Sequence, residues 1–347
     1  MNAAPAPPET SRCVVALDVG GTSMKGALVD EHRRVRLRQS FPTPAVQGPE
    51  AVLDQMATAI ATLTARAAEA GLAPPQAAGV VVPGIVDEAR GVAVIAANIG
   101  WRDAPLASVL RERLGLPVAL GHDVRAGGLA ESRLGAAKGA RDVLFVALGT
   151  GIAASCIVDG RPLIAGGYAG EVGHVVVEPD GEPCGCGGRG CLERVASAAA
   201  IARRYTSRSG VAVTGAAEVA AKVRAGDPVA VAVWEEAVAA LVDVLHTSLT
   251  LLGSEVVVLG GGLAEAGDLL LEPLRTGLDE RLSFQRRPRL VQAALGDQAG
   301  CLGAALLAWS LVDALEEPSD EEASSDDQGG HDRKHDEFEG YERKATP

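Results

Sequence analysis

The chain of 347 residues is long enough for two domains of ordinary size or for one large one. Apolar residues make up 47% of it and charged residues 22%, which excludes a fully disordered chain and a collagen-like fibre. Aromatic residues make up 3%, so a platform for stacking nucleic-acid bases is not expected. The net charge of −13 argues against non-specific binding to nucleic acid or to an anionic membrane.

The two ends differ in composition from the rest of the chain. Residues 1–12 are rich in Pro and Ala and lack the apolar core of a secretory signal, which predicts a disordered leader and a cytoplasmic location. Residues 316–347 carry 12 acidic and four basic side chains, which predicts a disordered acidic tail. The longest apolar segment, residues 228–252, contains four ionisable side chains and is predicted to be a helix of a soluble domain.

Apolar periodicity and turn residues predict an alternation of strands and helices. In chain order, the pattern predicts strands at 13–19, 24–29 and 35–41, a helix at 50–70, a strand at 78–82, a helix at 106–114, a strand at 118–120, a helix at 124–134, strands at 143–148 and 152–158, helices at 195–207, 216–225 and 228–252, a strand at 255–259, a helix at 269–282, a strand at 289–293 and a helix at 300–315. For the helix at 228–252, Asp227 is the expected N-cap.

The pattern of an apolar strand, a Gly/Thr turn and a second apolar strand occurs twice, from residue 13 and again from residue 143. A hairpin of this kind excludes a Rossmann unit, in which a helix follows the glycines. The recurrence indicates two related halves.

Three glycine turns follow apolar strands: Gly20-Gly21-Thr22, Gly149-Thr150-Gly151 and Gly260-Gly261-Gly262. A single such turn is explained by the conformational freedom of glycine alone. Three turns, two of them with Thr, favour a bound polyphosphate, because backbone N–H groups in such turns form anion-binding concavities. The chain has no Walker motif, so a P-loop is excluded.

Two carboxylates are candidates for chemistry at these turns. Asp18 ends the first strand, where a carboxylate beside phosphates calls for a cation, so it is a candidate to hold Mg²⁺ through water; capping the turn is the alternative. Lys25 is either a phosphate contact or a solvated strand residue. Asp123 follows a strand and His122 and precedes a helix, which suits a general base that accepts a proton from an attacking hydroxyl. A helix N-cap is the alternative for Asp123, and the two roles are compatible.

The strongest local motif is a cluster of one His and three Cys with the spacing H-x9-C-x-C-x4-C, formed by His174, Cys184, Cys186 and Cys191. Three thiolates and an imidazole make a closed tetrahedral Zn²⁺ site, so we expect a structural zinc ion; redox or disulfide chemistry is the alternative. The other cysteines lie in apolar surroundings and are expected to be core thiols: Cys13, Cys156 and Cys301.

Glu171 and Glu193 flank this cluster, and a fixed pair of carboxylates is suited to accept hydrogen bonds from vicinal sugar hydroxyls. His174 has a second ring nitrogen that is free to donate to a sugar. Asn98 offers both a donor and an acceptor. Taken singly, each Glu also fits a solvated surface position and Asn98 a turn.

Together these motifs resemble the ROK family of sugar kinases and sugar-responsive regulators. The resemblance covers about residues 13–315 and rests on the segments Leu17-Asp18-Val19-Gly20-Gly21-Thr22, Pro83-Gly84-Ile85-Val86-Asp87, Asn98-Ile99-Gly100-Trp101, His122-Asp123, Leu148-Gly149-Thr150-Gly151-Ile152, Gly170-Glu171-Val172-Gly173-His174, Cys184 to Glu193 and Gly260-Gly261-Gly262.

The resemblance implies an α/β chain with the actin/hexokinase-like (ribonuclease H-like) fold, in which two α/β domains enclose a central cleft. The first domain would span residues 13–120, completed by the helix at 300–315, and the second 121–299, including the zinc loop. It further implies a homo-oligomer, since family members are commonly dimers or tetramers.

The resemblance also implies roles for the candidate residues. Asp123 would deprotonate the sugar 6-hydroxyl, with Mg²⁺ near Asp18. The first two glycine turns would hold the ATP phosphates and the third would border the adenosine. The hexose would be held by Gly84, Asn98, His122, Glu171, His174 and Glu193.

Two positions depart from the family pattern. His122 stands where an Asn is usual, and Ala153 and Ala154 follow the second turn where family kinases carry more glycines. The expected activity is ATP-dependent phosphorylation of glucose, in carbohydrate metabolism. A kinase for N-acetylglucosamine or N-acetylmannosamine, and a catalytically weak sugar sensor without a DNA-binding domain, are the alternatives.

Overall fold

In the computed structural model, which describes residues 10–317, β1 (Cys13–Val19) lies at the centre of a five-stranded sheet with the order β3-β2-β1-β4-β8. β2 and β3 are antiparallel neighbours, whereas β4 and β8 run parallel to β1. The bounds of these strands are Ser23–Asp30 for β2, Val35–Pro42 for β3, Ala78–Val82 for β4 and Val118–His122 for β8.

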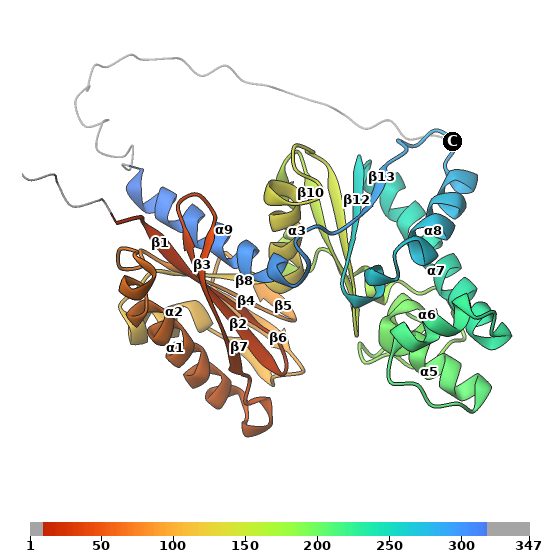
Figure 1. Ribbon diagram of the computed structural model, residues 1–347, viewed down its shortest axis with the longest axis horizontal. Coiled ribbons are helices and arrows are strands. Elements are labelled where there is room, and N and C mark those ends of the chain that lie inside the picture. Colours follow the sequence, from red (N-terminus) through yellow and green to blue (C-terminus); the bar gives the residue numbers. More distant parts are fainter. Residues whose placement is uncertain (1–9, 318–347) are drawn as a thin grey trace, which may run out of the picture.

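Both faces of this sheet are covered, because alternate residues of β1 enter different cores. Val15 and Leu17 pack with α1 (Pro49–Ala65) and α2 (Leu106–Leu114). Val14 and Ala16 pack with α9 (Ala299–Glu316). The last helix therefore returns to the first sheet, and Figure 1 shows it crossing there from the other half.

The second half repeats this topology. Its sheet has the order β11-β10-β9-β12-β13, with β10 and β11 antiparallel and β12 and β13 parallel to their neighbours. The strands are β9 (Val143–Leu148), β10 (Ile152–Val158), β11 (Arg161–Pro162), β12 (Val256–Gly260) and β13 (Arg289–Gln292). The predicted recurrence is thus matched by two sheets of equivalent strand order and direction.

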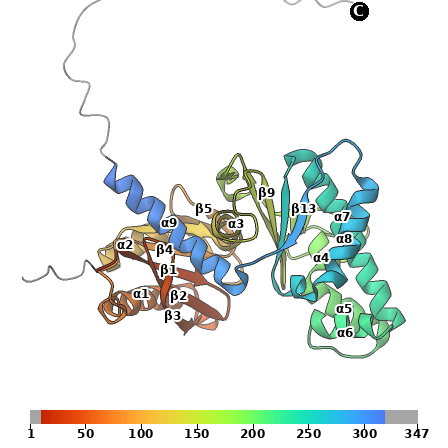
Figure 2. The same ribbon diagram turned by 45° about the horizontal axis from the view of Figure 1, so that its top comes forward.

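Helices also cover both faces of the second sheet. Helix α3 (Asp123–Leu134) packs on β9 and β10 and lies between the two halves (Figure 2). The remaining helices pack on the opposite face: α4 (Leu192–Ala196), α5 (Ala198–Ser209), α6 (Ala216–Arg224), α7 (Pro228–Leu252) and α8 (Asp268–Arg281).

Several boundaries differ from the prediction for identifiable reasons. The helix predicted at 195–207 is two helices, because Ser197 is extended and its hydroxyl accepts a hydrogen bond from the amide of Ala200 as the N-cap of α5. The helix predicted at 50–70 ends at Ala65 and is followed by a 3₁₀ turn, Ala68–Ala70. A three-stranded sheet was not predicted, because its strands are too short for a periodic signal: β5 (Ile85–Asp87), β6 (Val92–Ala96) and β7 (Trp101–Ala104).

The predictions at the chain ends fall largely outside the described residues. Ser11 and Arg12, expected in the leader, already contact the fold: Ser11 bridges Leu72, and the Arg12 guanidinium donates to Gln76. The acidic segment beyond residue 317 lies outside the part of the chain that the structure describes.

Two long helices are apolar in composition. α7 begins as predicted, since Asp227 Oδ1 accepts hydrogen bonds from the amides of Val229 and Ala230 at 2.9 and 3.0 Å.

Within residues 10–317, a single helical segment, Gly296–Glu316, is long and apolar enough to cross a membrane by length and composition. Half of it is buried against the protein, and core helices also meet this criterion.

Candidate active site

The carboxyl ends of β1, β4 and β8 meet at one edge of the first sheet, because the three strands are parallel. Asp18 lies near the end of β1, Gly84 follows β4, and Asp123 follows β8. Gly84 has a φ of 97°, and a Cβ there would lie 2.1 Å from the carbonyl oxygen of Ile95. Only glycine fits this approach of the chain to β6.

The Asp123 carboxyl contacts its neighbours through one of its two oxygens. Oδ1 accepts a hydrogen bond from the amide of Val124 at 2.7 Å and lies 3.4 Å from Nε2 of His122. Burial, followed by the negative charges of Asp18 and Glu171, raises the pKa of Asp123 to about 7, although the Val124 amide and a nearby arginine oppose the shift. The side chain is 31% exposed, and among the described residues Oδ1 is the oxygen that accepts a hydrogen bond.

His122, and not Asp123, is the N-cap of α3. Its Nδ1 accepts a hydrogen bond from the amide of Arg125 at 3.3 Å. Burial and the charge of Arg125 lower the pKa of His122 to about 3, so the ring is neutral at physiological pH. Because Nδ1 accepts, the ring hydrogen is on Nε2, which faces Asp123.

Asp18 and Lys25 both lie near the start of α9. A Cβ on Gly300 would be 2.5 Å from Asp18 Oδ2, so the helix backbone approaches this carboxylate directly. Burial raises the pKa of Asp18 to about 6, against the opposing charge of Lys25. The Lys25 ammonium lies 3.6 Å from the Asp297 carboxylate and donates to its carbonyl oxygen at 3.3 Å. Lys25 therefore contacts the segment that joins the two halves.

The first glycine turn lies beside Asn98. The amide of Gly20 donates to the carbonyl oxygen of Ser23 at 3.0 Å, which closes the hairpin between β1 and β2. A Cβ on Gly21 would lie 3.7 Å from the Asn98 side-chain amide. The structure thus places a predicted phosphate turn next to a predicted sugar contact.

The second and third turns pack on each other. Gly261 has a φ of 82°, and a Cβ there would lie 2.5 Å from the carbonyl oxygen of Leu148, the residue before the second turn. The amide of Gly149 donates to the carbonyl oxygen of Gly151 at 2.9 Å. The two turns therefore form one glycine-rich surface at the ends of β9 and β12.

Glu193 forms a hydrogen bond to the backbone at the second turn, and this contact was not predicted from the sequence. Its Oε2 accepts a hydrogen bond from the amide of Ile152 at 2.9 Å. A Cβ on Gly151 would lie 2.5 Å from the same oxygen. One carboxylate oxygen thus fixes the backbone of the turn, and Oε1 remains for a ligand.

The four predicted metal ligands converge. Their ligand atoms all lie within 4.8 Å of one another; they are His174, Cys184, Cys186 and Cys191. The separations of 3.6 Å from Cys184 Sγ to His174 Nδ1 and of 3.6 Å from Cys186 Sγ to Cys191 Sγ fit a tetrahedral zinc, for which Zn–ligand bond lengths give about 3.6 Å and about 3.8 Å.

The same imidazole faces both the cluster and a predicted sugar ligand. His174 turns Nδ1 toward the thiols, and its Nε2 lies 3.9 Å from Glu171 Oε2. Burial raises the pKa of Glu171, and the neighbouring Glu193 adds to the shift. The zinc ligands and the two glutamates therefore form one contiguous unit.

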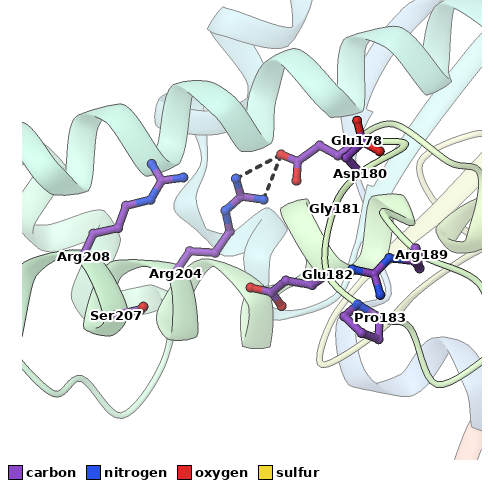
Figure 3. A pocket seen from close by; sticks show the side chains of 9 residues that line it. All are labelled: Glu178, Asp180, Gly181, Glu182, Pro183, Arg189, Arg204, Ser207 and Arg208. Carbon is purple, nitrogen blue, oxygen red and sulfur yellow. Dashed lines mark hydrogen bonds and ion pairs between the residues drawn. The ribbon is translucent and has the colours of Figure 1, made fainter.

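Ion pairs fasten the zinc loop to the helices behind it. A pocket of about 420 Å³ lies beside this loop, and in it the Arg204 guanidinium donates to Glu178 at 3.0 Å. Figure 3 shows the two side chains facing each other. The same guanidinium donates to Glu236 of α7 at 2.9 Å. The lining of this pocket contains none of the predicted site residues, so we assign these charges to anchoring the loop.

Sequence reasoning missed two charged residues at the site, Arg125 and Glu88. Arg125 is 2% exposed and donates to Glu88 Oε1 at 2.8 Å. A signal was present, because Arg125 is followed on α3 by small residues such as Gly127 and Gly128, which indicate that this part of the helix packs closely against its neighbours.

Comparisons with known proteins identify the family of the chain. The profile of the ROK family matches residues 14–310. Glucokinase of Streptomyces coelicolor is 34% identical over 320 residues, which cover 85% of this chain and 96% of the relative. N-acetylmannosamine kinase of Citrobacter koseri is 31% identical over 301 residues, covering 85% and 98%.

A solved structure shows the same fold. The crystal structure of a ROK family glucokinase from Streptomyces griseus in complex with glucose and AMPPNP is 30% identical, with a TM-score of 0.73 and coverage of 86% of this chain and 99% of the other. The two sheets described above are thus those of the actin/hexokinase-like fold, as predicted. The chain belongs to the ROK family, and the relatives named here are sugar kinases.

Proposed function

We propose that this protein transfers the γ-phosphoryl group of ATP to the 6-hydroxyl of a hexose, with glucose as the preferred acceptor. The observation that carries the proposal is Asp123, a carboxyl with a pKa raised to about 7 and one unengaged oxygen at the carboxyl edge of the first sheet. A carboxylate of that pKa is a base at neutral pH and still accepts a proton readily. Similarity to glucokinases supports the choice of glucose.

In this mechanism, Asp123 Oδ2 accepts the proton of the sugar hydroxyl as its oxygen attacks the γ-phosphorus of ATP, and ADP leaves. The neutral ring of His122 lies with Nε2 3.4 Å from Oδ1, and Oδ2 would be the oxygen that faces the hydroxyl. Glu171 and the imidazole of His174 would accept and donate hydrogen bonds to the hexose hydroxyls, and Asn98, beside the first turn, would add a further contact.

The phosphates would lie against the glycine turns, where backbone N–H groups other than those of Gly20 and Gly149, which close their turns, would be the donors. Asp18 fits a Mg²⁺ site, since it is a buried carboxylate beside the first turn. Burial disfavours its charged form and so raises its pKa, and a bound cation would stabilise that charged form. Mg²⁺ there would neutralise charge on the transferring phosphoryl group.

The second turn supports a kinase over a weak sugar sensor. Ala153 and Ala154 stand where more glycines were expected, and both already pair in β10 with Ala147 and Val146 of β9. Their methyl groups therefore belong to the strand and lie beyond the turn, which ends at Gly151. The turn itself retains Gly149 and Gly151, so the two alanines add no side chain to it.

Steady-state assays with Mg-ATP and a panel of sugars test the proposal. We expect ADP release to depend on sugar, with the highest kcat/KM for glucose among glucose, mannose, N-acetylglucosamine and N-acetylmannosamine. A preference for an N-acetyl sugar would retain the kinase and change the substrate. Tight sugar binding by calorimetry without turnover on any of the four would contradict the proposal and favour a sensor.

The rate should rise with pH. Because the pKa of Asp123 is raised to about 7, its basic form is populated only above that pH, so kcat/KM is expected to increase through about pH 7 and level off above it. Protonation of Asp18, whose pKa is raised to about 6, should steepen the fall at lower pH. A kcat/KM profile for glucose from pH 5.5 to 9 measures this, and a flat profile below pH 7 would count against Asp123 as the base.

Glu193 should affect ATP as well as sugar. Glu193→Ala removes the acceptor of the Ile152 amide, and a hydrogen bond to a charged group contributes about 1.5–3 kcal/mol, so we expect KM for ATP to rise about tenfold or more. Glu193→Gln keeps an acceptor oxygen and should raise it less. Separate titrations of ATP and glucose measure the two effects, with Glu218→Ala on the exposed side of α6 as control. A change confined to KM for glucose would refute the contact's role in the turn.

A further inference from the structure

Arg125 is a buried cation two residues after Asp123. It lies in the first turn of α3 and is 2% exposed. A charged side chain is almost never buried without a structural or functional reason, because its desolvation must be offset by several good hydrogen bonds.

The Arg125 guanidinium uses all three of its nitrogens. Nε donates to Glu88 Oε1 at 2.8 Å, Nη2 to the carbonyl oxygen of Val86 at 3.1 Å, and Nη1 to the carbonyl oxygen of Gly167 at 3.1 Å. Val86 and Glu88 belong to the small sheet of the first half and the turn after it, whereas Gly167 belongs to a 3₁₀ turn, Ala165–Gly167, of the second half. One side chain therefore joins the two halves of the molecule.

The two carbonyl groups meet at a point of close approach between the halves. Gly167 has a φ of 98°, and a Cβ there would lie 2.4 Å from the Val86 carbonyl oxygen. The two backbones touch at this point, and both carbonyl groups turn toward the same guanidinium. Arg125 therefore donates to a backbone acceptor from each half at this point.

The same network reaches the residue that precedes the base. Glu88 Oε1 also accepts a hydrogen bond from the backbone amide of His122 at 3.3 Å. The Arg125 amide donates to His122 Nδ1, and its carbonyl oxygen accepts from the Ser155 hydroxyl at 3.3 Å. The orientation of His122 is thus set from both its backbone and its ring, and Nε2 of that ring faces Asp123 Oδ1 at 3.4 Å.

We propose that Arg125 and Glu88 form a positioning pair for the base, which fixes His122, and through it the Asp123 carboxylate, at the junction of the two halves. The inference rests on the proposed kinase function. It assigns to Arg125 a role in kcat through the geometry of Asp123, without contact to sugar or nucleotide.

The charges that face Asp123 come from four elements. Asp18 on β1 and Glu171 in the zinc-loop region are negative, Arg125 on α3 is positive, and the ring of His122 at the end of β8 is neutral. Loss of the Arg125 charge leaves the Asp123 carboxylate facing the carboxylates of Asp18 and Glu171. Proton transfer from the substrate hydroxyl to Asp123 should therefore lose both its geometry and its pH range when Arg125 is neutralised.

Kinetics of Arg125→Met, Glu88→Gln and the control Arg133→Met test the proposal. Arg133 lies on the same helix with an exposed bond to the Gly160 carbonyl oxygen. We expect kcat of Arg125→Met, per folded molecule, to fall at least about 30-fold with KM for glucose changed less than threefold, and the acid limb of its pH profile to move upward. Glu88→Gln should show the same split with a smaller loss, and Arg133→Met neither. A kcat within threefold of wild type in folded Arg125→Met and Glu88→Gln, or a loss that appears only in KM, would overturn the inference.

A second readout does not depend on activity. In ¹H–¹⁵N spectra of the histidine side chains, with His122 assigned from a His122→Asn variant, the wild type should show His122 as the neutral Nε2–H form. That signal should change in Glu88→Gln, which also decides the matter if Arg125→Met does not fold. An inactive wild type would refute the proposed function, whereas an unchanged His122 signal in Glu88→Gln would refute the positioning pair.

Discussion

Replacing Asp123 by Asn is expected to lower kcat by about 10²- to 10⁴-fold, the range that a positioned general base contributes. The amide cannot accept the hydroxyl proton, yet it has the shape of the carboxyl and can still accept the Val124 hydrogen bond through its oxygen. KM for glucose and for ATP should change little, because the variant removes the proton acceptor and leaves the binding groups in place.

The same variant should be at least as stable as the wild type. An acid whose pKa is raised from 3.8 to about 7 on folding destabilises the folded state progressively as the pH rises between these values, and the penalty persists above them. Asparagine has no such ionisation. Thermal unfolding at pH 8 should therefore give a melting temperature equal to or above that of the wild type. A variant that keeps a tenth or more of the wild-type kcat would show that Asp123 is not the base. If Asp123→Asn folds poorly, Asp123→Ser replaces it in the same test.

Replacing Cys191 by Ser is expected to remove the zinc ion and to disorder the loop from His174 to Glu193. A structural zinc contributes an apparent binding free energy of about 10–16 kcal/mol in small zinc domains, and the loop holds few apolar side chains that could replace it. Because Glu193 fixes the second turn and Glu171 faces the zinc-facing imidazole, activity should fall with the metal.

Metal analysis, limited proteolysis and kinetics measured on the same sample check this expectation. The wild type should contain one zinc per chain and resist cleavage in the loop, whereas Cys191→Ser should do neither. Cys156→Ala, which changes a core thiol on β10, is the control and should keep zinc and activity. A metal-free variant with full kcat and an intact loop would show that the cluster does not support the site.

The sequence was most informative where the chemistry is local. The zinc ligands are close in sequence, so their convergence follows from four residues and their spacing. The inner strands β4, β9 and β12 carry continuous apolar runs because both of their faces are covered, and this makes them visible without a structure. Asp123 stands at a strand-to-helix junction, which a single segment of sequence already shows.

Contacts between distant segments could not be predicted in this way. Glu193 was expected to hold sugar, and its bond to the Ile152 amide depends on how the zinc loop folds back over 41 residues. The proposed role of Arg125 depends on its hydrogen bonds to Val86 and Gly167, which belong to different halves. Lys25 was expected at the phosphates, and its pairing with Asp297 depends on the return of α9 to the first sheet. Long-range packing decides each of these, and local patterns do not encode it.

In the proposed mechanism, Asp123 accepts a proton from a hexose hydroxyl during transfer of phosphate from ATP. The most direct test is glucose-dependent ADP formation by the wild type and by Asp123→Asn at pH 8, with the phosphorylated product identified by ³¹P NMR. We expect glucose 6-phosphate from the wild type and a rate at least about 100-fold lower from the variant. A wild type that forms no sugar phosphate, or a variant that forms it at the same rate, would contradict it.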